Sequence, residues 1–300
     1  MIILGVNGGG TRTRAMAYKP DGTLIGSGYS GSSNYHNMGL RKAAANIREA
    51  VSKAGIRKAD IACVALAGMD ADEHFDEVMP AVAGLARKVV VEQDSFAELY
   101  AETRGGKGVI AVAGTGSSVI GTDGKRRFRA SGCGWLLSDD GSGYAIGREG
   151  LRSVCRAMNA GYMDTLLTKA VLDEVGAEDL NGLVIWAYKE SHNIGRIAQA
   201  AIAVDKAAKE GDEEAVRIIK EAGGRLASYA NDIAMKVGVR KVYCTGGMFK
   251  SHLYAATFSG ALKKHGVDMK IAKNNPAVGA ACIAADRLGG IGKLFMPEEE

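Results

Sequence analysis

Apolar runs and glycine-rich turns alternate along the chain in an order that occurs twice. Residues 1–30 predict a strand, a Gly/Thr turn, a second strand, a tight Asp-Gly turn at 21–22 and a third strand. Residues 107–131 repeat this order, with a second Asp-Gly pair at 123–124. Because Asp-Gly pairs accept the positive φ angles of two-residue hairpins, each copy predicts three strands joined by antiparallel connections.

Helical and apolar stretches alternate after each triplet of strands, which predicts two similar mixed sheets with helices on their faces. A mostly helical insertion at about 143–238 delays this alternation in the second half. Two unrelated hairpins within one α/β domain are the alternative interpretation. The expected elements are helices at 40–54, 73–86 and 95–104 and strands at 60–67 and 89–93 in the first half, then strands at 241–246 and 267–272 and helices at 251–265 and 276–288 in the second.

Composition narrows the class of protein. The net charge is only +4 over 300 residues, and Lys and Arg are scattered apart from a short cluster at 125–127, so we expect no nucleic-acid partner. Five cysteines without a CxxC spacing indicate reduced thiols in the cytoplasm. The apolar N-terminus is too short for a signal segment or a membrane span, and no later apolar run is long enough. We therefore expect no membrane association.

The two Gly/Thr turns carry the first chemical signal. Successive backbone N–H groups with no Cβ in the way can converge on an anion. Two such turns at equivalent places of a repeat can grip a triphosphate from both sides, whereas the P-loop signature GxxxxGK[ST] is absent. The turns consist of Gly8, Gly9, Gly10 and Thr11 in the first copy and Gly114, Thr115, Gly116 and Ser117 in the second.

Six segments, taken in order, resemble the N-acetylglucosamine kinase and archaeal hexokinase branch of the actin-like ATPase superfamily, to which the BadF/BadG-type ATPases belong. The resemblance covers nearly the whole chain. It implies an α/β fold of two actin-like (ribonuclease H-like) domains, each a mixed five-stranded sheet flanked by helices, with ATP in the interdomain cleft. We expect one domain at 1–106, joined by a C-terminal helix near 287–300, and a second at 107–286. The segments are VNGGGTRTRAMAY, SSNYHN, VVVEQD, VAGTGS, GWLLSDDGSGYAIGREG and TGGM.

The resemblance implies an ATP- and Mg²⁺-dependent kinase for a hexose or amino sugar, such as glucose, N-acetylglucosamine, glucosamine or mannose. The two glycine turns would bind the phosphates, and Gly246, Gly247 and Met248 would lie on the adenosine side. Asp94 ends an apolar strand and opens a helix, the place where open α/β sheets present ligand-binding groups. Residue type alone favours an N-cap role for Asp94. The resemblance instead makes it the general base for a sugar hydroxyl.

Polar residues in the loop 32–37 are candidate sugar ligands. Asn34, His36 and Asn37 can donate and accept hydrogen bonds toward hydroxyl groups, although a surface loop would look much the same. By resemblance, Asn34 is the first expected sugar ligand and His36 the second.

A second polar cluster opens the helical insertion. Asp139 and Asp140 could bind sugar hydroxyls or hold Mg²⁺ through water, whereas a neutral interpretation makes Asp140 or Ser142 the N-cap of the next helix. By resemblance, Asp139, Thr115 and the backbone near Gly143 lie at the sugar.

Asn7 departs from the family pattern, which places an acidic residue just before the first glycine turn. An amide oxygen is a poorer ligand for Mg²⁺ than a carboxylate. Asn7 is therefore a doubtful metal ligand, and Mg²⁺ would rely on the ATP phosphates with Asp139 or Asp140.

Two other functions fit the same fold. One is an ATPase that activates an acyl-CoA dehydratase or reductase through an iron-sulfur cluster shared by two subunits, with Cys133 as a conceivable ligand. The other is an ATP-driven switch or sugar-sensing regulator. For the kinase we expect a homodimer and a hinge near 104–108 and again near the C-terminus, where the last helix would pack back on the first domain.

Overall fold

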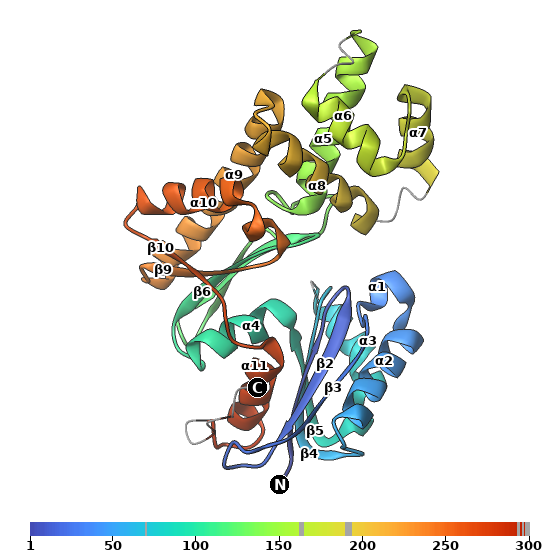
Figure 1. The fold of residues 1–300 in the computed structure, drawn as a ribbon. Helices are drawn as coiled ribbons and strands as arrows, with labels where there is room; N and C mark the ends of the chain where they lie inside the picture. The colour runs from blue at the N-terminus through green and yellow to red at the C-terminus, as the bar shows by residue number, and fades with distance from the viewer. Residues whose placement is uncertain (70, 162–164, 190–193, 293–294, 296, 298–300) are drawn as a thin grey trace. The chain divides into compact units, whose positions relative to one another are not determined.

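A computed structural model describes residues 1–69, 71–161, 165–189, 194–292, 295 and 297. The chain divides into two compact units, each built around a mixed five-stranded sheet (Figure 1). The predicted α/β class with two such sheets is confirmed. No helix in the described ranges is long and apolar enough to span a bilayer. Unit 1 comprises Met1–Gly108, Thr122–Arg126 and Ala272–Glu300, and unit 2 comprises Val109–Gly121 and Arg127–Ile271.

The sheet of unit 1 has the strand order β3-β2-β1-β4-β5. β1 pairs antiparallel with β2 and parallel with β4, and β4 pairs parallel with β5. In this register Gly8 stands opposite Leu66, which stands opposite Gln93. The three parallel strands therefore end side by side at one edge of the sheet. The strands are β1 (Ile3–Gly8), β2 (Arg12–Tyr18), β3 (Leu24–Gly31), β4 (Ala59–Leu66) and β5 (Ala86–Gln93).

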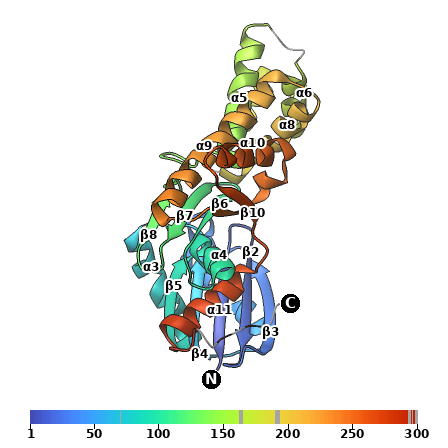
Figure 2. The ribbon, with the colours of Figure 1, turned by 90° about the vertical axis from the view of Figure 1, so that its left-hand side faces the viewer.

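Helices cover both faces of this sheet, because alternate residues of a strand point to opposite faces. Leu4 and Val6 pack into one core with α2 (Leu40–Lys53) and α3 (Asp72–Val82). The other face is covered by α4 (Asp94–Thr103) and α11 (Pro276–Arg287), which lie side by side (Figure 2). The short helices α1 (Tyr35–Met38) and η1 (Ala83–Leu85) lie with α2 and α3, since Tyr35 and Leu85 belong to the same core.

Helix α11 packs in unit 1, whereas the sequence pattern grouped it with the second half of the chain. The reason is the close fit of small residues. A Cβ on Gly5 would overlap the backbone of α11 at Ala277 and Ala281, and a Cβ on Gly279 would overlap the backbone of α4 at Ala97. Only a glycine and alanine surface allows this approach of strand and helices. Hydrophobic periodicity does not report which sheet such a surface meets.

The sheet of unit 2 has the order β10-β9-β6-β7-β8, and β6 and β10 both pair parallel with β9. Helices α5 to α9 occupy the range expected for the insertion and share one large core with the sheet. Their ends follow capping rules, since Ser142, Thr165 and Asp212 accept N-terminal backbone N–H groups. The elements are β6 (Gly108–Ala113), β7 (Ser117–Thr122), β8 (Arg127–Ala130), α5 (Gly143–Asn159), α6 (Leu166–Val175), α7 (Leu180–Lys189), α8 (Ile194–Lys209), α9 (Glu213–Val237), β9 (Lys241–Thr245), η2 (Gly247–Lys250), α10 (His252–Lys263) and β10 (Asp268–Ile271).

Candidate functional site

In unit 1 the candidate residues gather where β1, β4 and β5 end. The strand register sets Gly8, Leu66 and Gln93 in a row. With neighbouring strands about 4.8 Å apart, Gly8 and Gln93 lie about 10 Å from each other. The first glycine turn, the loop after β4 and Asp94 therefore share one edge, the position at which open α/β sheets bind ligands.

The first glycine turn is supported from behind by hydroxyl groups. Gly9 donates its N–H to the carbonyl of Arg12 at 3.0 Å, which closes the turn. Behind it, the buried Thr13 hydroxyl donates to Gly31 O at 2.7 Å and lies 2.8 Å from Ser33 Oγ. A Cβ on Gly8 would overlap Ser33, whereas one on Gly10 would meet nothing within 4 Å. Gly10 and Thr11 are exposed, so the tip of the turn is open to a ligand.

Asp94 is the first residue of α4 rather than its N-cap. The cap position is Gln93, whose side chain makes no capping bond, and the Asp94 carboxylate accepts the Ser95 N–H at 2.7 Å. An anion in the first turn of a helix is stabilised by the helix dipole. Asp94 is half-buried at the end of the sheet, which suits a group that must meet a ligand.

The candidate sugar ligands of the loop 32–37, called the sugar loop below, stand on the next loop of the same edge. Asn34 caps α1, since its Oδ1 accepts the His36 N–H at 3.2 Å, and Asn37 is exposed. The His36 ring lies 4.8 Å from His74, and its Nε2 lies 2.9 Å from the carbonyl oxygen of Gly68. If Nε2 donates that bond, Nδ1 of neutral His36 is an acceptor.

The loop after β4 joins the sugar loop to Asp94. Gly68 O accepts from His36, and the next carbonyl, Met69 O, accepts from Gln93 Nε2 at 2.5 Å. Gly68 has φ +86°, and a Cβ there would come within 2.7 Å of His36 Cδ2. Two consecutive carbonyl groups thus fix the positions of residues on both sides. The sequence analysis did not select Gly68 or Gln93, although a glycine directly after a buried strand was an available signal.

In unit 2 the second glycine turn is held by the first turn of α5. A helix N-terminus leaves four N–H groups without intrahelical partners. In α5 the first two donate to Gly114 O at 2.8 Å and Thr115 O at 3.0 Å. The third donates to the Ser142 side chain at 3.0 Å, and the N–H of the cap residue Ser142 itself donates to Asp139 O at 3.0 Å. Ser142 is therefore the cap that the neutral interpretation named. Gly143, the first residue of α5, has its N–H in this clamp, so its amide is not available to a sugar in this arrangement.

Asp139 and Asp140 lie in different surroundings. Asp139 is buried beneath the second turn, in the left-handed region at φ +67°, and a Cβ on Gly116 would come within 2.6 Å of its Oδ2. Such a backbone angle is rare for residues other than glycine and clusters at functional sites. Asp140 Oδ2 accepts the Tyr229 hydroxyl at 2.9 Å, and Oδ1 lies 3.5 Å from Arg225. The hydrogen bond to this carboxylate raises the pKa of Tyr229.

The remaining predicted nucleotide residues follow β9. Because β6 and β9 are parallel neighbours, Gly246 begins at the same sheet edge as the second turn. Gly246 has φ +106°, and a Cβ there would overlap the backbone of Ala113. Gly247 is exposed with open space around its Cα, and Met248 is half-buried against the core. Thr115 is exposed, and Ser117 is buried with its Oγ donating to Asp140 O at 2.9 Å.

Asn7 fits a role toward a cation or its water shell. Its Oδ1 is buried and accepts no hydrogen bond from the described residues, directly before the first glycine turn. A buried acceptor without a donor is costly unless a ligand satisfies it. The described residues contain no cluster of three or more His, Cys, Asp or Glu placed to hold a metal.

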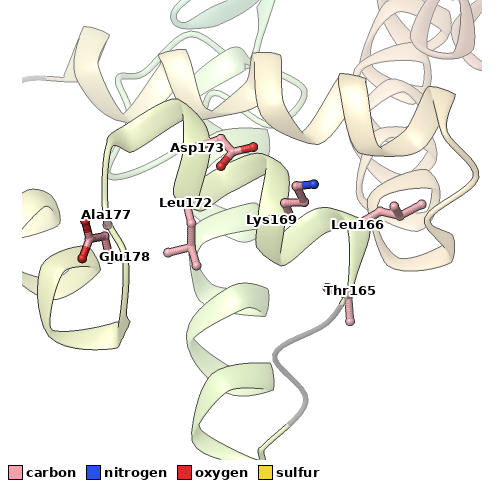
Figure 3. Close-up of a pocket in the computed structure, with 7 residues that line it drawn as sticks. All are labelled: Thr165, Leu166, Lys169, Leu172, Asp173, Ala177 and Glu178. Carbon is pink, nitrogen blue, oxygen red and sulfur yellow. The ribbon is translucent and has the colours of Figure 1, made fainter.

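The structure also has a pocket of about 510 Å³ in the helical insertion of unit 2 (Figure 3). It mixes charged and apolar side chains and contains none of the residues predicted for the site. The lining residues are Thr165, Leu166, Lys169, Leu172, Asp173, Ala177 and Glu178.

Relatives with named activities align over nearly the whole chain. The N-acetyl-D-glucosamine kinase of Dictyostelium discoideum is 27% identical over 310 residues, covering 94% of this chain and 97% of that protein. The N-acetylmuramic acid/N-acetylglucosamine kinase of Clostridium acetobutylicum is 25% identical over 299 residues, with the same two coverages.

Solved structures with the same fold include two kinases. The crystal structure of a proposed N-acetylglucosamine kinase from Chromobacterium violaceum matches with a TM-score of 0.79 at 24% identity, over 94% of this chain and 98% of that one. The ROK hexokinase from Thermus thermophilus matches with a TM-score of 0.64 at 15% identity, over 97% and 100%. These likenesses establish the actin-like ATPase fold.

A sequence profile of one ATPase family spans nearly all of the elements described above, from β1 into α11. The match covers residues 4–284. The chain therefore belongs to the BadF/BadG/BcrA/BcrD ATPase family, and N-acetylglucosamine kinases are among its distant homologues.

Proposed function

We propose that this protein is an ATP-dependent sugar kinase that transfers the γ-phosphate of ATP to a hydroxyl of a hexose or amino sugar. One observation carries the proposal. The register of β1, β4 and β5 sets the first glycine turn, the loop that positions His36, and Asp94 at a single sheet edge. In this proposal the first glycine turn binds phosphate, His36 binds a sugar hydroxyl, and Asp94 accepts a proton.

Asp94 is the general base in this proposal. Its carboxylate accepts the proton of the attacking sugar hydroxyl as the hydroxyl oxygen bonds to the γ-phosphorus and ADP leaves. Catalysis then rests on positioning and on neutralising phosphate charge, because phosphoryl transfer needs little covalent chemistry from the protein. The proposed sugar ligands of unit 1 are Asn34, His36 and Asn37. Those of unit 2 are Asp139 and Thr115.

The nucleotide is bound by backbone groups of both glycine turns and by Gly246 to Met248. Open space around Gly10 and the exposed Thr115 hydroxyl support phosphate contacts, and the open Gly247 supports an adenosine contact. Mg²⁺, when bound, would neutralise charge on the phosphates. In unit 1 the residue that would hold it, through water or directly, is Asn7; in unit 2 the candidate is Asp139. Asp140 is the weaker candidate, because Tyr229 and Arg225 already engage its oxygens.

Amino sugars come first among the substrates we propose. Three relatives are named for such activities, including the glucosamine kinase of Vibrio cholerae, which is 27% identical over 191 residues. A homodimer belongs to the same proposal and can be checked by light scattering.

A coupled ADP-release assay with Mg-ATP and a panel of hexoses and amino sugars tests the proposal. We expect sugar-dependent ADP release in the wild-type protein and a kcat about 10³-fold lower in Asp94→Asn, within the range that general bases contribute. ATP affinity should stay unchanged, because the amide keeps the shape of Asp94.

Two outcomes would contradict the kinase proposal. One is wild-type protein that binds ATP but releases no ADP in response to any sugar. The other is Asp94→Asn with wild-type kcat. In the first case, iron analysis and the visible spectrum would examine the activator alternative, in which Cys133, an exposed thiol, supplies a cluster ligand.

A further inference from the structure

A buried carboxylate lies two residues before Asp94 and takes no part in the site described above. Glu92 is 2% exposed and is the penultimate residue of β5. Burial of an ionised side chain is unfavourable unless partners satisfy its charge and hydrogen bonds. Glu92 is therefore expected to have partners for its charge and for its hydrogen bonds.

Both oxygens of Glu92 are engaged, and the two contacts point to different elements. Oε2 forms an ion pair with Arg287 Nη1 at 2.8 Å. Oε1 accepts the backbone N–H of Gln93 at 2.9 Å. The carboxylate thus joins the last residue of α11 to the backbone amide that directly precedes Asp94.

Arg287 is itself held in a defined orientation. Its guanidinium lies over the ring of Phe96, 5.5 Å from the ring centroid. Phe96 is buried in the first turn of α4, two residues after Asp94. One arginine therefore contacts the chain on both sides of Asp94, and its planar, always charged group is suited to a stacked ion pair in a way that lysine is not.

A second hydrogen bond restrains the junction between β5 and α4 from the opposite face of the sheet. Gln93 Nε2 donates to Met69 O, so the junction between β5 and α4 is also attached to the loop after β4. Glu92 and Gln93 point to opposite faces of the sheet, as neighbouring strand residues do. Together they restrain the backbone in front of Asp94 from both faces.

We propose that the Glu92–Arg287 ion pair is a positioning device that holds Asp94 in the geometry needed for proton abstraction. The inference rests on the proposed function, since it gives Asp94 the role of base. Neither residue touches the substrate. The pair acts through the Gln93 amide and the Phe96 ring, and its loss displaces the carboxylate. A displacement of about 1 Å at a catalytic group can lower the rate about 100-fold.

The test compares single and double variants in the sugar-dependent ADP-release assay. Glu92→Gln keeps the side-chain shape but removes the charge. Arg287→Met leaves Glu92 buried without its partner and can impair folding, because an unpaired buried charge is strongly unfavourable. The double variant Glu92→Gln/Arg287→Met has no buried charge and should unfold near the wild-type denaturant midpoint. We expect its kcat to fall 10- to 100-fold, while KM for sugar and for ATP changes less than about threefold. Arg287→Lys should have a kcat between that of Arg287→Met and that of the wild type.

Tyr100→Phe is the matched control, because Tyr100 also links α4 to α11. Its hydroxyl donates to Asp286 Oδ2 at 2.7 Å, and its ring centroid lies 6.1 Å from that of Phe96. Tyr100→Phe keeps this ring contact and removes only the hydroxyl contact with α11. We expect this variant to lose stability and to keep the wild-type kcat. If the double variant has wild-type kcat, or if Tyr100→Phe lowers kcat equally, the pair is merely structural and the proposal is wrong.

The wild-type protein and Asp94→Asn distinguish a failure of this inference from a failure of the proposed function. Wild-type protein without sugar-dependent ADP release, or Asp94→Asn with wild-type kcat, overturns the base assignment and this inference with it. An active wild type and an inactive Asp94→Asn, combined with a fully active double variant, overturn only the positioning role of Glu92 and Arg287.

Discussion

The two glycine turns occupy equivalent places in a repeated plan, yet different atoms support them. Side-chain hydroxyls stand behind the first turn, where Gly8 lies against Ser33 and Ser33 bonds to Thr13. Backbone groups hold the second turn, where the first two N–H groups of α5 donate to its carbonyls.

This difference changes what each turn can offer an anion. A helix N-terminus is often an anion site because its N–H groups are free. In α5 all four of these groups already have partners within unit 2. In the proposed function, the second turn would therefore offer phosphate only its own N–H and hydroxyl groups. The same motif produced an open tip in one unit and a clamped loop in the other.

The largest loss of stability is expected from a substitution that disturbs the side chains behind the first glycine turn. Gly8→Ala places a Cβ against Ser33 and within 2.5 Å of Leu66 Cδ2 in a fully packed region. We expect it to lower the free energy of unfolding by about 2 kcal/mol, a usual cost of overpacking. Gly10→Ala, at a position with open space, should stay within about 0.5 kcal/mol of wild type. Urea denaturation measures both, and equal losses would show that the turn is not supported from behind.

An intermediate loss of stability is expected when the N-cap of α5, the helix that holds the second glycine turn, is removed. Ser142→Ala removes the side chain that caps α5 and should cost about 1 kcal/mol. Ser251→Ala removes the equivalent cap of α10 and should cost about the same. Only Ser142→Ala should also weaken ATP binding, measured by calorimetry, since only α5 clamps the Gly114–Ser117 turn. Equal ATP affinity in the two variants would argue against the clamp.

The smallest effect concerns acid stability of unit 2, where α9 meets α5. Arg217 holds the pKa of Glu214 down, to about 2 from 4.5, with burial opposing and Ser153 of α5 assisting. Because the folded pKa is depressed, this stabilisation is complete above pH 4.5 and is lost as the pH falls toward 2. The Glu214 side chain is 40% exposed. After allowance for solvent screening, we expect a contribution below about 1 kcal/mol.

Glu214→Gln tests this contribution. Its unfolding free energy should lie slightly below that of wild type at pH 6, and the difference should shrink steadily as the pH falls toward 2 in urea titrations. A difference that stays constant with pH would exclude the ion pair as its source.

Part of the candidate site followed from the sequence. The end of an apolar strand placed Asp94 at a sheet edge, and the glycine turns fell where two strands of each triplet meet. The structure made two distinctions that residue type could not. It showed Gln93, not Asp94, at the cap position, and it engaged Asp140 with Tyr229 and Arg225 while burying Asp139. Adjacent identical residues carry no sequence signal that separates their surroundings.

The sequence by itself determined the plan of strands, turns and helices and the resemblance to one ATPase family, because periodicity, turn residues and short motifs are local. Tertiary structure decided the support of the turns, the packing of α11 against Gly5, and the pair between Glu92 and Arg287, which are 195 residues apart. Such contacts depend on which surfaces can approach closely and which buried charges find partners. Those are properties of the folded chain, and a one-dimensional pattern of residue types does not contain them.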